Sequence, residues 1–108
     1  MVKNRKDENQ VISDIVVEIV KFLKDKDIEV QRILLFGSRV TGKSKTFSDI
    51  DIAIETKNSV PFRTRRILKE KIDNVSGIYT ADLIFLNDVD NSFREIIIEN
   101  GQVLYEEN

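Results

Sequence analysis

The sequence predicts an α/β (α+β) domain, with a mixed β-sheet of about four strands and helices packed against it. Segments with apolar residues at three- and four-residue intervals predict helices. Short runs rich in β-branched residues, bounded by glycine or polar residues, predict strands, and the two kinds of segment alternate along the chain. At 108 residues the chain can build one hydrophobic core, so we expect a single domain over residues 1–108, with residues 1–8 as a disordered tail.

The first half of the chain predicts a helix followed by two strands. From Glu8 to about Lys26 the apolar residues form one stripe of a helix. Val30–Phe36 is an apolar run that predicts a buried strand, and Gly37 ends it. The polar segment Ser38–Thr46 predicts a loop or a single helical turn. Asp49–Glu55 alternates isoleucine with mainly acidic residues, which predicts a strand with one apolar face.

The second half predicts two further helices and two further strands. Pro61 is typical of a helix start, and a stripe of apolar residues as far as Val75 follows it. Thr80–Leu86 predicts a third strand. Residues Asp90 to Ser92 can cap a helix over Phe93–Asn100, with Gly101 after its end. Gln102–Glu106 predicts a short closing strand, and we interpret Tyr79 and Tyr105 as packing residues.

The composition excludes several classes of chemistry. The chain has no cysteine and no histidine, which excludes disulfides, thiolate metal sites, Ser-His-Asp triads and histidine general bases. The net charge of −2 gives no global attraction to nucleic acid. The polar N-terminus resembles no signal peptide, and no apolar run is long enough to span a membrane. We therefore expect a soluble, cytoplasmic protein whose chemistry depends on carboxylates, hydroxyls, lysine or arginine.

Three aspartates predict a divalent-metal site. Asp49 and Asp51 alternate in a predicted strand, so both side chains point the same way, about 6.5–7 Å apart along the backbone. Such a pair can hold one cation or two, and Mg²⁺ suits it because Mg²⁺ takes oxygen ligands and substrate phosphates. Asp82, at the start of another apolar run, can complete the site and help to accept the proton of an attacking hydroxyl. Clustered carboxylates repel one another, so bound cations stabilise them.

The residues before this pair predict a phosphate-binding turn. Gly37 allows the backbone to turn tightly and to approach a phosphate closely. Ser38 and the following amides can donate hydrogen bonds to phosphate oxygens. Arg39 and Lys43 are placed to neutralise a triphosphate as charge moves onto the leaving pyrophosphate. Together with the aspartates, this arrangement indicates metal-assisted transfer from a nucleoside triphosphate.

Each of these features also has a plainer interpretation. Taken alone, Asp49 and Asp51 are typical of an edge strand that shows carboxylates to water, Gly37 of an ordinary turn, and Asp82 of a capping residue. Their joint spacing favours the site. The basic residues of the second helix alternate with acidic ones and favour a solvated face, with contact to a nucleotide or an acidic partner as the alternative; they are Arg63, Arg65, Arg66, Lys69 and Lys71.

At these residues the chain resembles the nucleotidyltransferase superfamily that includes DNA polymerase beta, and within it the minimal nucleotidyltransferase (MNT) domains. The family signature is Gly-Ser, ten residues, then Asp-x-Asp, found here from Gly37 to Asp51, and Asp82 resembles the later acidic position. The wider pattern matches at Arg39, Gly42, Ser48 and Ala53, and the resemblance extends from about Ile28 to Glu106. Thr41 departs from the pattern, because relatives often carry arginine there, which puts one phosphate contact in doubt.

The resemblance implies a nucleotidyltransferase fold that uses ATP and Mg²⁺, with two ions. It further implies an antitoxin, of a type VII-like system, that transfers AMP to a tyrosine of a small helical HEPN ribonuclease toxin. The partners expected are therefore ATP and that toxin, in a homo- or hetero-oligomer, without a nucleic-acid template or a membrane. Two alternatives stay open: a binding module that neutralises its partner by occlusion, with little or no catalysis, and a nucleotide-binding protein without a stable protein partner.

Overall fold

The computed structural model describes residues 7–37 and 50–107, and within them it forms an α/β fold. The helices are α1 (Glu8–Asp25), α3 (Phe62–Val75) and α4 (Asn91–Asn100), and the strands are β1 (Val30–Phe36), β2 (Ile50–Thr56), β3 (Ala81–Phe85) and β4 (Gln102–Glu106). A single 3₁₀ turn, η1 (Leu86–Asp88), which the sequence did not predict, follows β3. Within the described ranges, no helix is both long and apolar enough to cross a membrane.

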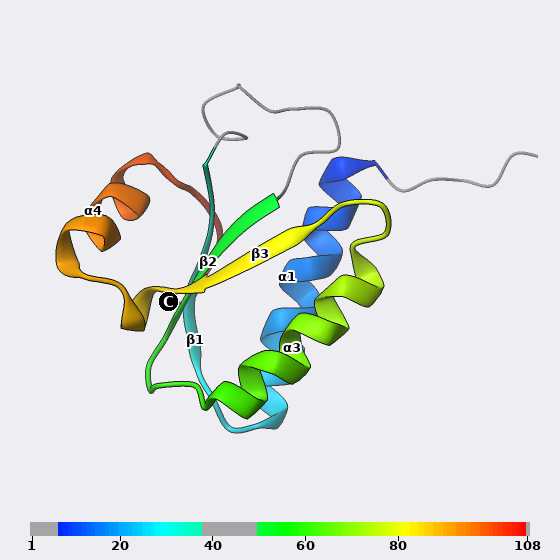
Figure 1. The fold of residues 1–108 in the computed structure, drawn as a ribbon, viewed down its shortest axis with the longest axis horizontal. Helices are drawn as coiled ribbons and strands as arrows, with labels where there is room; N and C mark the ends of the chain where they lie inside the picture. Colours follow the sequence, from blue (N-terminus) through cyan, green and yellow to red (C-terminus); the bar gives the residue numbers. More distant parts are fainter. Residues whose placement is uncertain (1–6, 38–49, 108) are drawn as a thin grey trace, which may run out of the picture.

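The described strands form one mixed sheet in the order β3-β2-β1-β4. β1 pairs antiparallel with β2 on one side and with β4 on the other, whereas β2 and β3 run parallel. The parallel pair needs a crossover connection, and α3 provides it. β3 and β4 are therefore the two edge strands of this sheet, as Figure 1 shows for β3 beside β2.

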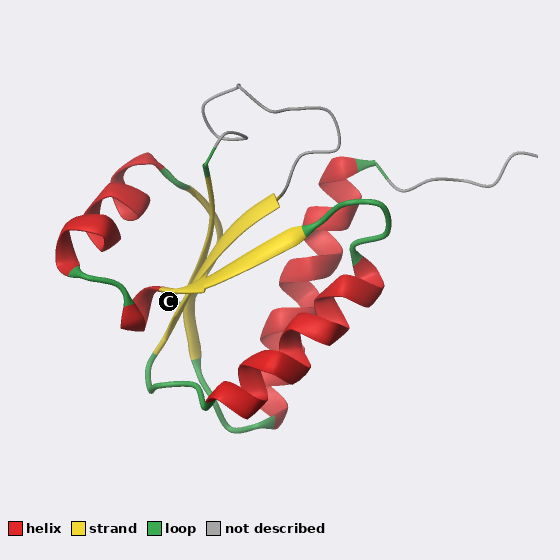
Figure 2. Ribbon diagram, in the orientation of Figure 1, coloured by secondary structure: helices red, strands yellow, loops and turns green. Residues whose placement is uncertain are grey.

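One face of the sheet is covered by α1 and α3, which lie side by side (Figures 1 and 2). Ile15 and Ile19 of α1 and Ile72 of α3 are fully buried there, against strand residues such as Ile33 and Ile52. Burial of each such aliphatic side chain contributes about 1.5–3 kcal/mol to the free energy of unfolding. This is the apolar face that the isoleucine alternation in β2 predicted.

The opposite face of the sheet is covered by α4 and η1 (Figure 1). Leu34, Ala53, Leu86 and Ile97 form a second, smaller buried cluster there. The prediction that β2 has only one apolar face is therefore wrong for residues 52–56, which are buried on both sides of the sheet. The reason is that η1 and α4, which come much later in the chain, cover these residues, whereas Asp51 stays partly exposed.

The helix ends follow the expected capping chemistry. Asp7 caps α1, and its carboxylate accepts a hydrogen bond of 2.8 Å from the backbone N–H of Gln10. Asp7, which the sequence placed in the polar tail, is thus the cap of the first helix, and Glu8 is its first residue, where the apolar stripe predicted the helix to begin. Asp90 caps α4 in the same way, accepting from the N–H of Phe93. At the other end, a side chain at Gly101 would lie 2.6 Å from the carbonyl oxygen of Ile97, so only glycine fits there.

Candidate active site

Asp51 and Asp82 lie directly opposite each other on the parallel strands β2 and β3. Their neighbours along each strand are buried under α1 and α3, so by alternation both carboxylates belong to the opposite face of the sheet. Paired residues of adjacent strands are about 4.8 Å apart between backbones, close enough for two carboxylates to bind one cation. Asp82 is exposed and Asp51 is partly exposed. The register therefore brings two of the three predicted acidic residues together.

Gly37 lies on the other side of Asp51, at the end of β1. Phe36, its neighbour, pairs with Asp51 across the sheet. Gly37 has a φ of +85°, a conformation that residues with a side chain rarely adopt. A Cβ atom at this position would lie 2.4 Å from Oδ2 of Asp51, which is far inside van der Waals contact. The backbone of Gly37 thus packs directly against the Asp51 carboxylate, and glycine is required for that approach.

Four of the predicted site residues lie outside the described part of the chain. They are Ser38, Arg39, Lys43 and Asp49, all between the end of β1 and the start of β2. The segment that contains them joins Gly37 to Ile50, so both of its ends lie at the Asp51 edge of the site. Their roles, like those of Gly37, Asp51 and Asp82, stay predictions.

The donor atoms of this site suit a hard divalent cation. Asp51 and Asp82 offer carboxylate oxygens, which are the ligands that Mg²⁺ prefers. Among the residues that the structure describes, no group of three or more acidic, histidine or cysteine side chains could hold a metal ion. Two protein carboxylates still fit Mg²⁺, because this ion is usually bound by one or two carboxylates together with water and substrate phosphates.

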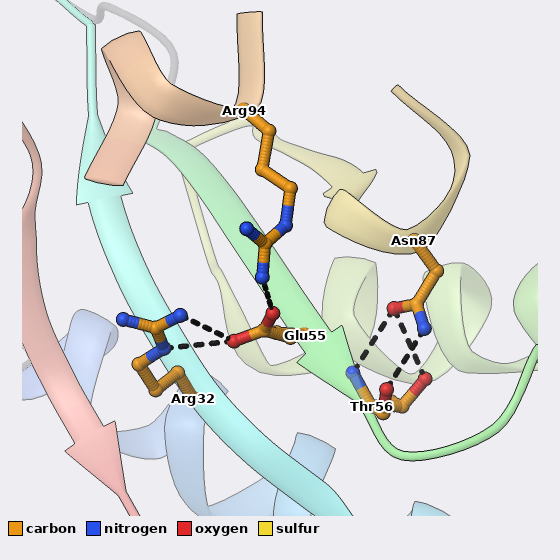
Figure 3. Close-up of polar contacts among 5 residues, drawn as sticks. All are labelled: Arg32, Glu55, Thr56, Asn87 and Arg94. Carbon is orange, nitrogen blue, oxygen red and sulfur yellow. Dashed lines mark hydrogen bonds and ion pairs between the residues drawn. The ribbon is translucent and has the colours of Figure 1, made fainter. Parts of the chain in front are cut away.

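A buried charge cluster fixes α4 to the sheet at the other end of β2. Glu55 is only 8% exposed, and its carboxylate accepts hydrogen bonds from Arg32 of β1 and from Arg94 of α4 (Figure 3). The Nε atom of Arg32 lies 2.8 Å from Oε1 of Glu55, and its Nη2 atom lies 2.7 Å away. Burial raises the pKa of the Glu55 carboxyl, but the hydrogen bonds and charges of Arg32 and Arg94 outweigh it and hold the pKa below its ordinary value.

The hydrogen bonds of Asn87 continue the β2–β3 pairing beyond the end of the strands (Figure 3). Its side-chain oxygen accepts from the backbone N–H of Thr56 at 3.1 Å, and its side-chain nitrogen donates to the Thr56 carbonyl at 2.8 Å. The amide of Asn87 thereby replaces the backbone partner that Thr56 would have on a longer strand. Glu55 and Asn87 together hold the end of β2 that lies away from Asp51 to its neighbouring elements.

Arg65 of α3 is not the solvated residue that its sequence context favoured. Its guanidinium lies 4.6 Å from the ring centre of Phe85 and 5.0 Å from that of Phe62. It also forms an ion pair with Asp88 and donates a hydrogen bond of 2.7 Å to the carbonyl of Val60. Arg63, Arg66 and Lys71 are exposed, as the solvated-face interpretation predicted.

Comparison with known proteins shows which family the chain resembles. The family model described as "Polymerase beta, Nucleotidyltransferase" matches residues 17–108. The chain is 35% identical over 79 residues to the probable protein adenylyltransferase MntA of Haemophilus influenzae, covering 73% of this chain and 69% of that protein. It is also 31% identical over 70 residues to a spectinomycin 9-adenylyltransferase of Staphylococcus aureus, covering 64% of this chain but 27% of that enzyme.

Solved structures of toxin–antitoxin complexes share the fold. A chain of a toxin–antitoxin complex with AMP-PNP superposes with a TM-score of 0.69 and 27% identity, over 85% of this chain and 73% of that one. A chain of a complex between a tri-AMPylated HEPN toxin of Shewanella oneidensis and its MNT antitoxin superposes with a TM-score of 0.63, over 88% of this chain and 72% of that one. Identity to the latter chain is 24%, so that likeness shows the fold.

Proposed function

The chain belongs to the polymerase beta nucleotidyltransferase family, and we propose that its reaction is the transfer of AMP from ATP to a protein hydroxyl. The observation that carries this proposal is the register that sets Asp51 opposite Asp82, with the bare backbone of Gly37 beside them. The 35% identity to a protein adenylyltransferase supports a protein acceptor. Because ATP is the donor, the proposal places the chain in the cytoplasm.

In the proposed reaction, the acceptor oxygen forms a bond to the α-phosphorus of ATP. The bond between that phosphorus and the bridging oxygen breaks, and pyrophosphate leaves. The proton of the acceptor hydroxyl passes to Asp82, which lies at the exposed edge of the pair, and from there to water. Gly37 and the segment that begins at Ser38 bind the triphosphate, with Arg39 and Lys43 neutralising the negative charge that develops on pyrophosphate.

Asp51 and Asp82, with Asp49, would hold Mg²⁺ in this site. When bound, the ions neutralise the phosphate oxygens and orient the attacking and leaving oxygens. The two described carboxylates face each other across neighbouring strands, where their like charges repel. A bound cation would offset this repulsion, which is why we assign the pair to metal binding and not to a structural role.

For the acceptor, we propose a tyrosine of a small helical HEPN toxin, with this chain as the antitoxin. The resemblance to MNT domains implies this partner, and a toxin–antitoxin chain at 27% identity with AMP-PNP supports it. Transfer of AMP to the tyrosine would then neutralise the toxin by covalent modification and not by occlusion.

The direct test is to incubate the purified chain with ATP, Mg²⁺ and the candidate toxin, and to measure the intact mass of the toxin. We expect a mass increase of one or more AMP units on a tyrosine. Asp51→Asn should lower the rate at least about 100-fold, since even the outer-shell partners of metal ligands cost 10–100-fold. Asp25→Asn is the matched control, because Asp25 is exposed at the end of α1 and lies outside the site.

The occlusion alternative predicts a different result in the same experiment. If the Asp51→Asn variant neutralises the toxin at full strength while transferring no AMP, binding is the working mechanism. If the wild-type chain leaves an accessible acceptor tyrosine unmodified in the presence of ATP and Mg²⁺, the proposed reaction is wrong.

A further inference from the structure

A groove of about 560 Å³ follows the outer edge of β3 and opens beside α3. Asp82 lines the groove near the start of β3, and Val89 lines it beyond the strand's other end. Leu83 and Phe85 belong to the face under α3, whereas Ile84 and Asp82 belong to the opposite face. Because the lining comes from both faces, the groove runs along the strand edge itself. The candidate active site and this groove are therefore continuous through Asp82.

The order of the strands decides what can enter from this side. Gly37, the described part of the proposed triphosphate-binding turn, lies on the β1 side of Asp51. Asp82 lies on the opposite side, at the edge of the sheet. In an in-line displacement, the attacking group approaches from the side opposite the leaving pyrophosphate. The acceptor hydroxyl therefore approaches the α-phosphorus from the β3 side, where the groove lies.

The edge of β3 is suited to a peptide. In the described part of the chain, β3 has no strand partner on its outer side, so its backbone N–H and C=O groups there can pair with an extended segment. Phe62, at the α3 wall of the groove, is 84% exposed, an unusual state for a large aromatic side chain. An exposed aromatic side chain beside an open strand edge is typical of a docking surface for another protein.

The charges of the groove favour an acidic segment. Arg65, Arg66 and Lys69 line it, against the carboxylates of Asp82 and Asp88. Arg65 is paired with Asp88 and Lys69 with Asp73, whereas Arg66 forms no ion pair with any residue that the structure describes. Metal bound at Asp82 would neutralise the remaining carboxylate. The groove therefore presents net positive charge next to the reacting centre.

We propose that this groove binds the acceptor protein through an extended, acidic segment next to its acceptor tyrosine. The inference rests on the proposed function, and it adds the surface through which this chain selects its acceptor. Phe62 and Arg66 are specificity-determining residues in this account: Phe62 packs on an apolar side chain of the segment, and Arg66 pairs with one of its carboxylates.

The test compares two groove variants with two matched controls on the full chain. Phe62→Ala and Arg66→Glu change groove residues that are exposed, so the fold should be unaffected, and thermal unfolding checks this. Ile78→Ala and Arg63→Glu change an exposed apolar residue and an exposed arginine that lie outside the groove. For each protein we would measure the dissociation constant for the acceptor toxin, and the KM for toxin and for ATP in AMP transfer.

Each groove variant should weaken toxin binding and raise the KM for toxin about 5- to 30-fold, with the KM for ATP unchanged. High salt should reduce the effect of Arg66→Glu more than that of Phe62→Ala, because salt screens only the charge interaction. The controls should match the wild type.

Unchanged toxin binding in both groove variants would overturn the inference while leaving AMP transfer established. An equal rise in the KM for ATP would overturn it in favour of a nucleotide-binding groove. Because binding is measured separately from transfer, a wild-type chain that binds toxin but transfers no AMP would refute the proposed reaction and not the groove.

Discussion

Gly37→Ala is expected to damage the candidate active site more than the fold. The added methyl carbon would lie 2.4 Å from Oδ2 of Asp51, whereas real contacts of this kind stay above 3.0 Å. The carboxylate must therefore move by at least 0.6 Å, the difference between these two distances. A displacement of about 1 Å in a catalytic geometry can lower a rate about 100-fold, so we expect AMP transfer to fall roughly 10- to 100-fold.

The same substitution also has a conformational cost. Placing a residue with a side chain in the left-handed region costs about 1–2 kcal/mol. In a domain of this size, each kcal/mol lowers the midpoint of thermal unfolding by roughly 4–8 °C.

Gly77→Ala separates the conformational cost from the displacement of Asp51. Gly77 also has a positive φ, +64°, but a Cβ atom there would meet nothing within 4 Å. This variant should lose similar thermal stability and keep its AMP-transfer rate. If Gly37→Ala retained wild-type activity, or if both glycine variants lost activity equally, the inferred packing of Gly37 against Asp51 would be refuted.

Three further predictions concern Asp82 of the site and two residues that hold β2 to its neighbours. Glu55→Gln should lower the free energy of unfolding by about 1–3 kcal/mol at neutral pH, since Arg32 and Arg94 lose their shared anion but keep contact with water. The pKa of Glu55 is lowered from about 4.5, so its contribution to the free energy of unfolding is present above that pH and is lost as the pH falls below it. Urea unfolding of the wild type and of Glu55→Gln should show their difference in free energy shrinking at low pH. A difference independent of pH would contradict this. Asn87→Ala should cost about 1–2 kcal/mol in the same assay by leaving the Thr56 backbone groups without their partner, and a neutral result would show that water replaces the amide. Asp82→Asn should be as stable as the wild type in EDTA, or more stable by about 0.2–1 kcal/mol, because it removes one of two facing carboxylates; a marked loss of stability would point to a structural role.

Most of the fold could be predicted from local patterns. The bounds of β1 and β4 match the expected strands, and those of α1, β2 and β3 agree within one or two residues in the described ranges. These elements are readable because their apolar periodicity is set by burial on a single face or by a buried run. Asp90 and Gly101 were equally readable, because capping depends on the identity of one or two residues.

What local patterns could not supply was contact between distant segments. Glu55 was assigned to the polar side of its strand because the burial of that side depends on α4, which comes much later in the sequence. Arg65 was interpreted as solvated because its neighbours are charged, but two aromatic rings and Asp88 surround it in the fold. The Asp51–Asp82 pairing depends on the register of β2 and β3, which the spacing alone does not define. The sequence grouped these residues only as a hypothesis about one metal site, and the resemblance to a known family supported that grouping.

Metal binding by the Asp51–Asp82 pair tests the account most directly. Mn²⁺ can replace Mg²⁺ as a spectroscopic probe, and its binding to the full chain with AMP-PNP can be followed by electron paramagnetic resonance. We expect the wild type and Asp25→Asn to bind Mn²⁺ alike, and Asp51→Asn and Asp82→Asn each to bind it at least about 10-fold more weakly. Equal Mn²⁺ affinity in all four proteins would contradict the assignment of these two carboxylates to the metal.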